Sequence, residues 1–526
     1  MLKSPFVNPN RGGRIVQYIR EAAASSRTRP GITREPSASI FARTFTTFAI
    51  LCSSIILSIL PNQAIAENAI DSDLSAVALL LQPSANTQEQ TWNWHMQNTD
   101  IVQSAPAFSA KYSGTNSLNP TGNTKETVSL DLYAGLRLWS GAEAHVDGLM
   151  WQGFGLSNTH GVESFPNGDA FKAGTQIPNL AFARLFVQQT IGFGGDTEEI
   201  IDSPLTLAGT RDISRLTLTF GRFTPLDIVD QNAYAADAHS QFMSWGLMAN
   251  LAWDYGQDTI GYGPGFAAQL NQLNWTLGYV IFCMPPYNNF QNTGSNDTGD
   301  DQYLIWPARG RWGQFFHSWA MALELERRYQ INNHPGAIRP LAYLDSASVA
   351  SYHAATALLN AVGPKADLSL AQRYRYKYGF GLNWEQEVIK NVGVFSRMGW
   401  NDGQVQAIQF CDANWTGSLG VSVQGDLWRR PGDTFGLGSV ISGASRQLQR
   451  YLNAGGLGIL AGDGALGYSP EKTLETYYDV QIFKNSLVSV HIAADYQFVA
   501  DPAFNSARGP VSVFLGRLHW EINPWT

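Results

Sequence analysis

The stretch 126–139, ETVSLDLYAGLRLW, alternates apolar and polar residues along its whole length. Leucine and other apolar residues occupy the even positions, while Ser129, Asp131, Tyr133 and Arg137 occupy odd ones. A period of two is typical of a β-strand with one face in an apolar environment. The run is longer than the roughly five or six residues of a soluble strand. It reaches the roughly 9–11 residues that a membrane-crossing strand requires.

The same alternation recurs along the chain. In 374–388, YRYKYGFGLNWEQEV, aromatic and apolar residues alternate with Arg375, Lys377 and Asn383. The pattern predicts sixteen strands with boundaries good to about ±2–4 residues. They are 104–112, 126–139, 143–153, 182–192, 213–223, 261–271, 274–284, 314–328, 337–347, 373–389, 392–401, 415–425, 433–443, 473–484, 487–499 and 510–521.

The connections between these segments alternate in length. Very short ones, such as 272–273 and 390–391, follow even-numbered segments, while long ones, such as 224–260, follow odd-numbered segments. Short turns at one end and long loops at the other are typical of an outer-membrane barrel, which closes because lipid cannot satisfy an open sheet edge. We therefore expect a closed antiparallel transmembrane β-barrel of about sixteen strands. Two alternatives stay open: eighteen strands, if 242–253 adds to the sheet, and a soluble β-sandwich or propeller.

Composition supports a membrane barrel over other classes. Charged residues make up 15% and aromatic residues 12%, and the mean hydropathy of −0.16 excludes a bundle of transmembrane helices. The formal net charge of −8 argues against a nucleic-acid partner. Arginines precede an apolar run at 45–60, and Ala64-Ile65-Ala66 follows it, which predicts a cleaved signal peptide over 1–66. An uncleaved membrane anchor is the alternative.

The expected domain organisation follows from these boundaries. Residues 67–103 are expected in the periplasm or at the barrel mouth, and 104–526 in the barrel. The sequence has no GxSxG or HExxH motif and no metal-spaced cluster of His and Cys, so neither an enzyme nor a cofactor is expected. Cys283 and Cys411 follow the predicted signal peptide, and spacing alone does not decide whether they pair.

Several longer motifs carry a resemblance to a known family. TVSLDLYAGLRLWSGAE, LTFGRFTPLDIVDQNAY, RYRYKYGFGLNWEQEV and DYQFVADPAFNSARGPVSVFLGRLHWE, within about 91–521, resemble the carbohydrate-selective porin family of the OprB type. The resemblance implies a sixteen-stranded porin in the outer membrane of a Gram-negative bacterium, with a narrow arginine-lined eyelet that favours glucose and other sugars over ions. One departure concerns the third long loop: where many relatives carry Asp-Pro-Arg, this chain has Asp237-Ala238-His239.

A sugar-selective pore needs hydrogen-bond donors, acceptors and aromatic surfaces that bind weakly enough to release the solute. Strand parity and the inward-folded third loop that the resemblance implies give the candidate pore-lining residues. They are Asp131, Tyr133, Arg137, Arg184, Arg375, Lys377, Asn383 and Arg397 on strands, and Asp227, Asp230, Asn232 and Tyr234 on the 224–260 loop.

Arg397 has the most central expected position, and its planar fork could donate to two sugar hydroxyls. The alternative for Arg397, as for each lumen charge, is a structural ion pair across the barrel. Passive diffusion of sugars is the expected function, in contact with outer-membrane lipid. A general or anion-preferring porin, or a surface binding protein, are the alternatives. The sequence does not decide between a monomer and a trimer.

Overall fold

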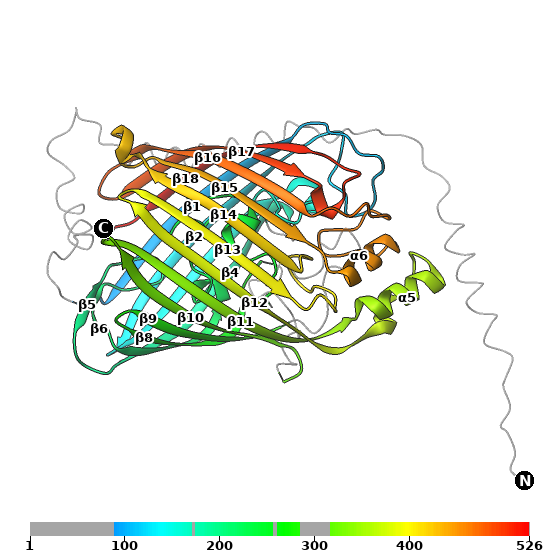
Figure 1. Ribbon diagram of the computed structural model, residues 1–526. Helices are drawn as coiled ribbons and strands as arrows, with labels where there is room; N and C mark the ends of the chain where they lie inside the picture. Colours follow the sequence, from blue (N-terminus) through cyan, green and yellow to red (C-terminus); the bar gives the residue numbers. More distant parts are fainter. Residues whose placement is uncertain (1–88, 171–173, 256–259, 285–315, 525–526) are drawn as a thin grey trace, which may run out of the picture. The chain divides into compact units, whose positions relative to one another are not determined.

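The computed structural model describes residues 89–170, 174–255, 260–284 and 316–524. Within them, sixteen antiparallel strands form one closed barrel, and β5 and β6 form a separate two-stranded hairpin (Figure 1). The strands are β1 (Trp92–Ala105), β2 (Asn123–Trp139), β3 (Ala142–Gly153), β4 (Thr175–Gly192), β5 (Thr197–Ile200), β6 (Gly209–Asp212), β7 (Arg215–Phe223), β8 (Gly263–Gln272), β9 (Trp275–Cys283), β10 (Trp319–Ile331), β11 (His334–Ala350), β12 (Gln372–Ile389), β13 (Val392–Asn401), β14 (Trp415–Gln424), β15 (Thr434–Gly443), β16 (Glu471–Lys484), β17 (Val488–Ala500) and β18 (Val511–Ile522).

Helices occur only between the strands of the described chain. The α-helices are α4 (Trp245–Met248), α5 (Tyr352–Val362) and α6 (Arg446–Asn453). Short 3-10 turns are η1 (Leu156–Asn158), η2 (Pro225–Asp227), η3 (Leu368–Ala371), η4 (Gly425–Trp428) and η5 (Pro502–Phe504). None of these helices is long and apolar enough to cross a membrane.

The barrel closes between its first and last strands. β1 pairs with β2 on one side and with β18 on the other, in a register that runs from Met96 opposite Ile522 to Ser104 opposite Phe514. The expected segments from 126–139 onward each coincide with a barrel strand. The closed antiparallel barrel is therefore confirmed, and the soluble sandwich and propeller are wrong.

Two strand predictions are wrong. The first strand is Trp92–Ala105 rather than 104–112, so the barrel begins inside the segment assigned to the periplasm or the barrel mouth. Asn98 and Asp100 lie on its outward face and weaken the apolar alternation that would have revealed it. Residues 242–253 add no strand pair, because they contain α4, and their apolar side chains pack inside the barrel. The predicted signal peptide and residues 67–88 lie outside the described residues.

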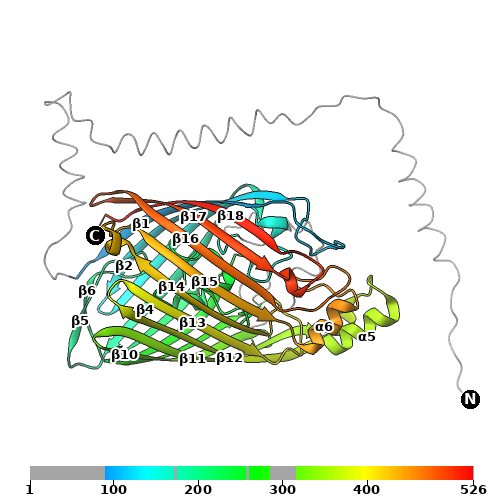
Figure 2. The same cartoon turned by 45° about the horizontal axis from the view of Figure 1, so that its top comes forward.

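The two ends of the barrel differ as expected. One end carries the short turns and the β5–β6 hairpin, and the other carries the long loops with α5 and α6 (Figures 1 and 2). We call them the turn end and the loop end. The hairpin folds back onto the wall at the turn end, where His95 on β1 lies 2.9 Å from Asp202 in the hairpin turn.

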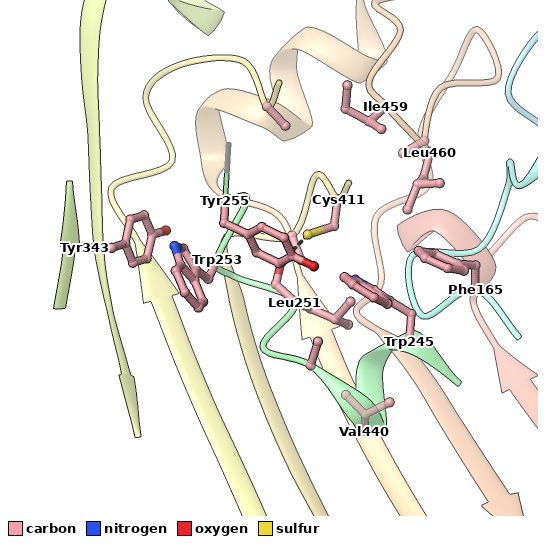
Figure 3. Packing of buried hydrophobic residues seen from close by; sticks show 14 of the residues in the cluster. Phe165, Trp245, Leu251, Trp253, Tyr255, Tyr343, Cys411, Val440, Ile459 and Leu460 are labelled. Carbon is pink, nitrogen blue, oxygen red and sulfur yellow. Dashed lines mark hydrogen bonds between the residues drawn. The ribbon is translucent and has the colours of Figure 1, made fainter. Parts of the chain in front are cut away.

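An apolar core fills part of the barrel interior, which strand alternation does not predict. Rings from separate loops stack there: Phe165 on Trp245 at 5.3 Å between centroids, and Tyr255 against Phe410 at 4.9 Å. Figure 3 shows Trp253 and Tyr255 of one loop beside Tyr343 of β11. The barrel interior therefore contains packed loops whose positions are fixed by burial of apolar area.

Buried carboxylates lock these loops to one another. Glu163 accepts hydrogen bonds from the backbone N–H groups of Asp412 and Ala413. Asp412 accepts three in turn, from residues 459–461, at 2.8–3.1 Å. Asp254 accepts three from residues 408–410. Hydrogen bonds from backbone N–H groups to a buried carboxylate are charge-assisted, so each junction holds two loop segments in one arrangement.

Candidate pore constriction

The described residues of the connection 224–262, between β7 and β8, lie inside the barrel and are anchored to the wall by a buried arginine. Arg397 on β13 is only 1% exposed. Its Nε donates to Asp230 Oδ1 at 3.0 Å, and its other N–H groups donate to the carbonyls of Asp230, Ala235 and Leu247 at 2.6–3.0 Å. A guanidinium presents five donors in a fixed plane, and four of them bind this one loop.

A second arginine anchors the same loop from another part of the wall. Arg517 on β18 donates through Nη1 to the carbonyls of Ala238 and Gln241, both at 2.8 Å. Its Nη2 pairs with Asp479 of β16 at 2.9 Å. These bonds and those of Arg397 together hold the loop 224–262 across the lumen at its middle.

A cluster of polar residues faces the loop from β1 to β4. Arg184 on β4 donates to Asp147 on β3 at 2.7 Å, and to both oxygens of Asp227 in the loop at 2.8 and 2.9 Å. The guanidinium carbon of Arg184 lies 4.9 Å from the centre of the Tyr262 ring. This residue therefore joins the wall to the loop by a bidentate ion pair and a cation–π contact.

The cluster continues along β1 and β2. Gln97 on β1 donates to Asp131 Oδ2 and to Tyr133 Oη, both at 3.0 Å, and its amide nitrogen lies 3.3 Å from a ring nitrogen of His239. The other ring nitrogen of His239 lies 2.9 Å from Asp169. His239 thus stands at the point where the loop 224–262 meets the β1–β2 wall.

His239 is a cation at neutral pH. Burial alone would lower its pKa, but the carboxylates of Asp169 and Asp237 outweigh that effect and raise the pKa to about 10. The charge of His239 in turn lowers the pKa of Asp237, against the effect of burial. The histidine therefore supplies a positive charge where the resemblance led us to expect an arginine.

Solvent reaches this cluster but not the loop anchors. The side chains of Arg184, Asp227 and His239 are 13%, 15% and 19% exposed, whereas those of Arg397 and Arg517 are 2% and 0% exposed. A solute in the lumen can contact only side chains that water also reaches. The cluster at β1–β4 is therefore the better candidate for the constriction.

The sequence-predicted site residues separate into distinct groups. Asp131, Tyr133, Arg184 and Asp227 meet in the β1–β4 cluster. A second group surrounds Arg397 and anchors the loop: Asp230 and Asn232 bond to Asn383, and the Tyr234 ring lies against the backbone of Gly393.

Three predicted residues belong to neither group. Arg137 lies at the turn end, where it donates to the carbonyls of Gln90 and Ala208. Arg375, toward the loop end, is half-buried and donates to the Val349 carbonyl at 3.5 Å. Lys377 is 3% exposed and lies 3.7 Å from Asp254.

Sequence reasoning missed several members of the cluster. Gln97 belongs to the strand that was misplaced, and Tyr262 and Asp169 lie in loops, where no periodicity marks the direction of a side chain. One signal pointed to His239, since the resemblance led us to expect an arginine at about this position. Cys283 and Cys411 are not joined by a disulfide. No group of three or more His, Cys, Asp or Glu in the described chain could hold a metal ion.

The barrel and its inward loop define the class of this protein as an outer-membrane porin. The model of the carbohydrate-selective porin, OprB family, matches residues 115–522, and the chain belongs to that family. Its location is the outer membrane of a Gram-negative bacterium. Porins of this family and fold are typically non-enzymatic. The turn end of the barrel is accordingly periplasmic and the loop end external.

A solved structure of Pseudomonas putida OprB supports the fold. The high-pH structure of Pseudomonas putida OprB matches with a TM-score of 0.59 and 13% identity, over 86% of this chain and 97% of that chain. The low-pH structure of the same protein matches with a TM-score of 0.43 and 11% identity, over 87% and 100%. Acinetobacter baumannii OccAB1 matches with a TM-score of 0.43 and 10% identity, over 83% and 99%. The comparison with curated proteins returned no match.

Proposed function

We propose that this porin passes neutral sugars such as glucose by passive diffusion, and that the β1–β4 cluster is its selective constriction. The observation that carries the proposal is the composition of the cluster, in which the side chains of Arg184, Asp227 and His239 are 13–19% exposed. It combines the guanidinium of Arg184, the rings of Tyr133 and Tyr262, and several carboxylates within one hydrogen-bonded group.

This combination suits the chemistry of a sugar. Carboxylates accept hydrogen bonds from hydroxyls, a guanidinium donates two parallel ones, and a tyrosine ring packs on the apolar C–H face of a pyranose. Because each of these polar groups already has a protein partner, a sugar gains only the difference between the two sets of hydrogen bonds. Weak binding of this kind lets a solute leave as readily as it enters.

The alternative in the same fold is an anion-preferring porin. Both cations of the cluster already contact carboxyl groups: Arg184 binds Asp147 and Asp227, and His239 lies 2.9 Å from Asp169. Neither cation is therefore left without an acidic partner, which supports a path for neutral sugars over a path for anions.

The test is to measure glucose block of single channels in planar bilayers for the variant Arg184→Lys. Lysine keeps the positive charge but cannot reproduce the bidentate geometry. Loss of one charge-assisted donor pair costs roughly 1.5–3 kcal/mol, so glucose affinity should fall by about tenfold or more. Arg375→Lys, toward the external end, is the matched control and should keep wild-type block. Equal glucose block in both variants and the wild type would remove the cluster from the sugar path.

A further inference from the structure

The β5–β6 hairpin is a long connection at the end of the barrel where short turns suffice. Two residues join neighbouring strands at 332–333 and at 390–391, whereas the connection between β4 and β7 runs from 193 to 214. The strands β5 and β6 pair with each other in a separate sheet, at the turn end of the barrel (Figure 1). Closure of the barrel therefore does not account for the hairpin.

The tip of the hairpin, residues 201–208, is bound by inward-facing side chains of β1. The amide of Asn93 donates to Asp202 Oδ1 at 2.8 Å and to the carbonyls of Ser203 and Thr206 at 3.0 and 3.3 Å. His95 lies 2.9 Å from the other oxygen of Asp202. Asn93 and His95 occupy the odd, inward positions of β1, so the hairpin tip lies on the lumen side of the wall.

The next two strands hold the hairpin tip from the same side. Arg137 on β2 donates to the carbonyl of Ala208 at 3.2 Å. Glu143 on β3 accepts a hydrogen bond from the backbone N–H of Leu207 at 3.3 Å and pairs with Arg211 at 2.6 Å. Leu207 is fully buried, and Glu143 is only 2% exposed. The hairpin tip therefore covers wall residues that would otherwise line the lumen.

The hairpin tip also contacts the apolar core inside the barrel. Leu205 packs against the core cluster that includes Phe186 of β4 and Val229 of the loop 224–262. Phe186 stacks on His145 of β3, with 5.2 Å between the ring centroids. The hairpin tip thus touches both the wall at β1–β3 and the packed interior, which places it inside the periplasmic mouth of the barrel.

Strand positions show that the hairpin tip lies directly below the β1–β4 cluster. His95 is two residues from Gln97 on β1, on the periplasmic side, and Asn93 is four residues from it. With a rise of about 3.3 Å per residue, the contacts of the tip lie roughly 7–13 Å along the strand from the cluster. A solute that leaves the cluster toward the periplasm must therefore pass the hairpin tip.

We propose that the hairpin tip is a second, fixed constriction in series with the β1–β4 cluster, and that it limits the size of solutes that leave toward the periplasm. Two packed layers of strands are about 10 Å apart, so a hairpin on the wall takes roughly that width from the passage. Buried and charge-assisted hydrogen bonds hold it there. The proposal concerns size, so it does not depend on the proposed sugar path.

Removal of the hairpin tests the proposal. Replacement of 197–212 by Asn-Gly joins Asp196 and Ile213, whose backbones already pair at 2.9 Å, through a favoured two-residue turn. Single-channel conductance is measured with poly(ethylene glycol) of increasing size, added on one side of a planar bilayer at a time. The variant should conduct more than the wild type. It should also admit, from the periplasmic side, polymers that the wild type excludes, while the exclusion limit from the external side and the glucose block stay unchanged.

Two results of this experiment would overturn the proposal. An unchanged periplasmic exclusion limit in the folded variant would show that the hairpin does not narrow the passage. Loss of glucose block with an unchanged limit would assign the hairpin to support of the cluster instead. The polymer measurement needs no glucose binding, so it separates a failure of this proposal from a failure of the proposed sugar path. The heat-dependent gel shift reports whether the barrel has folded.

A second variant keeps the full chain and releases the hairpin tip from the wall. Asn93→Ala, His95→Ala and Glu143→Ala together remove the bonds that β1 and β3 make to the tip. This triple variant should show noisier conductance and a larger periplasmic exclusion limit. Thr210→Ala, at an exposed position of β6, is the control and should behave as wild type. A wild-type exclusion limit in the triple variant would overturn the proposal even if the deletion variant does not fold.

Discussion

Removal of the Arg397 side chain should release the loop 224–262 from the barrel wall. In the folded protein this guanidinium makes an ion pair with Asp230 at 3.0 Å and donates to three loop carbonyls. In Arg397→Ala the carbonyls of Ala235 and Leu247 lose this donor, and Asp230 loses its ion pair. Asp230 keeps two bonds, from Asn383 at 2.8 Å and from the backbone of Asn250 at 3.1 Å.

The magnitude follows from burial. Because Arg397 and Asp230 are both less than 7% exposed, removal of one partner leaves a buried charge with weaker compensation. Breaking such a pair typically costs about 3–5 kcal/mol. At about 1.4 kcal/mol per decade, this cost should increase the population of the undocked loop by roughly a hundredfold to a few thousandfold. Arg517 still binds the carbonyls of Ala238 and Gln241, so the barrel itself should remain folded.

The assay combines single-channel conductance with limited chymotrypsin digestion of folded protein in detergent. The loop contains no lysine or arginine but carries Tyr234, Phe242 and Trp245, so its release exposes chymotrypsin sites. Arg397→Ala should be cleaved within the loop and should show a larger, noisier conductance. Arg375→Ala, which loses one long bond to a carbonyl, is the control and should behave as wild type. Wild-type conductance and protease resistance in Arg397→Ala would refute the anchoring role.

Three further predictions test the charge, the loop locks and the topology. The folded-state pKa of His239 is raised to about 10, so its stabilising contribution is complete below about pH 6.5 and lost as the pH rises through about 10. Ion selectivity, measured from reversal potentials, should therefore stay constant between pH 6 and 9. A transition near pH 6.5 would contradict the pairing of His239 with Asp169 and Asp237. Asp412→Asn replaces one carboxylate oxygen by an NH2 donor, which removes the acceptor of at least one of three backbone N–H groups. It should lower the unfolding temperature of the barrel, at about 1–3 kcal/mol per orphaned group, and an unchanged midpoint would show that this junction is dispensable. In a Cys283→Ser background, a cysteine at Ala465 should react with an impermeant maleimide on whole cells and one at Lys390 should not, and the reverse result would invert the assigned topology.

The barrel could be predicted from the sequence because membrane strands obey a local rule. A strand between lipid and an aqueous lumen must alternate, and 126–139 and 374–388 do so without interruption. The rule failed at β1, where Asn98 and Asp100 face outward.

The constriction could be predicted only in part, because loops follow no such rule. Strand parity correctly directed Asp131, Tyr133 and Arg184 into the lumen. Parity says nothing about how far an inward side chain is from solvent, and Arg397 has an inward position but is covered by the loop it binds. The position of a residue along its predicted strand is therefore a weaker guide to substrate contact than the path of the loops inside the barrel.

The hydrogen bonds that anchor the loop 224–262 also explain why a histidine can occupy a position where an arginine was expected. An exposed histidine would lose its charge near pH 6.5. His239 keeps its charge because the bonds from Arg517 to Ala238 and Gln241 fix the backbone on both sides of it, which holds its ring 2.9 Å from Asp169. A change in either anchor should therefore alter the charge at the constriction as well as its width. If the proposed constriction selects solutes, selectivity depends on buried residues that no solute touches, and substitutions there should change sugar block and ion selectivity together.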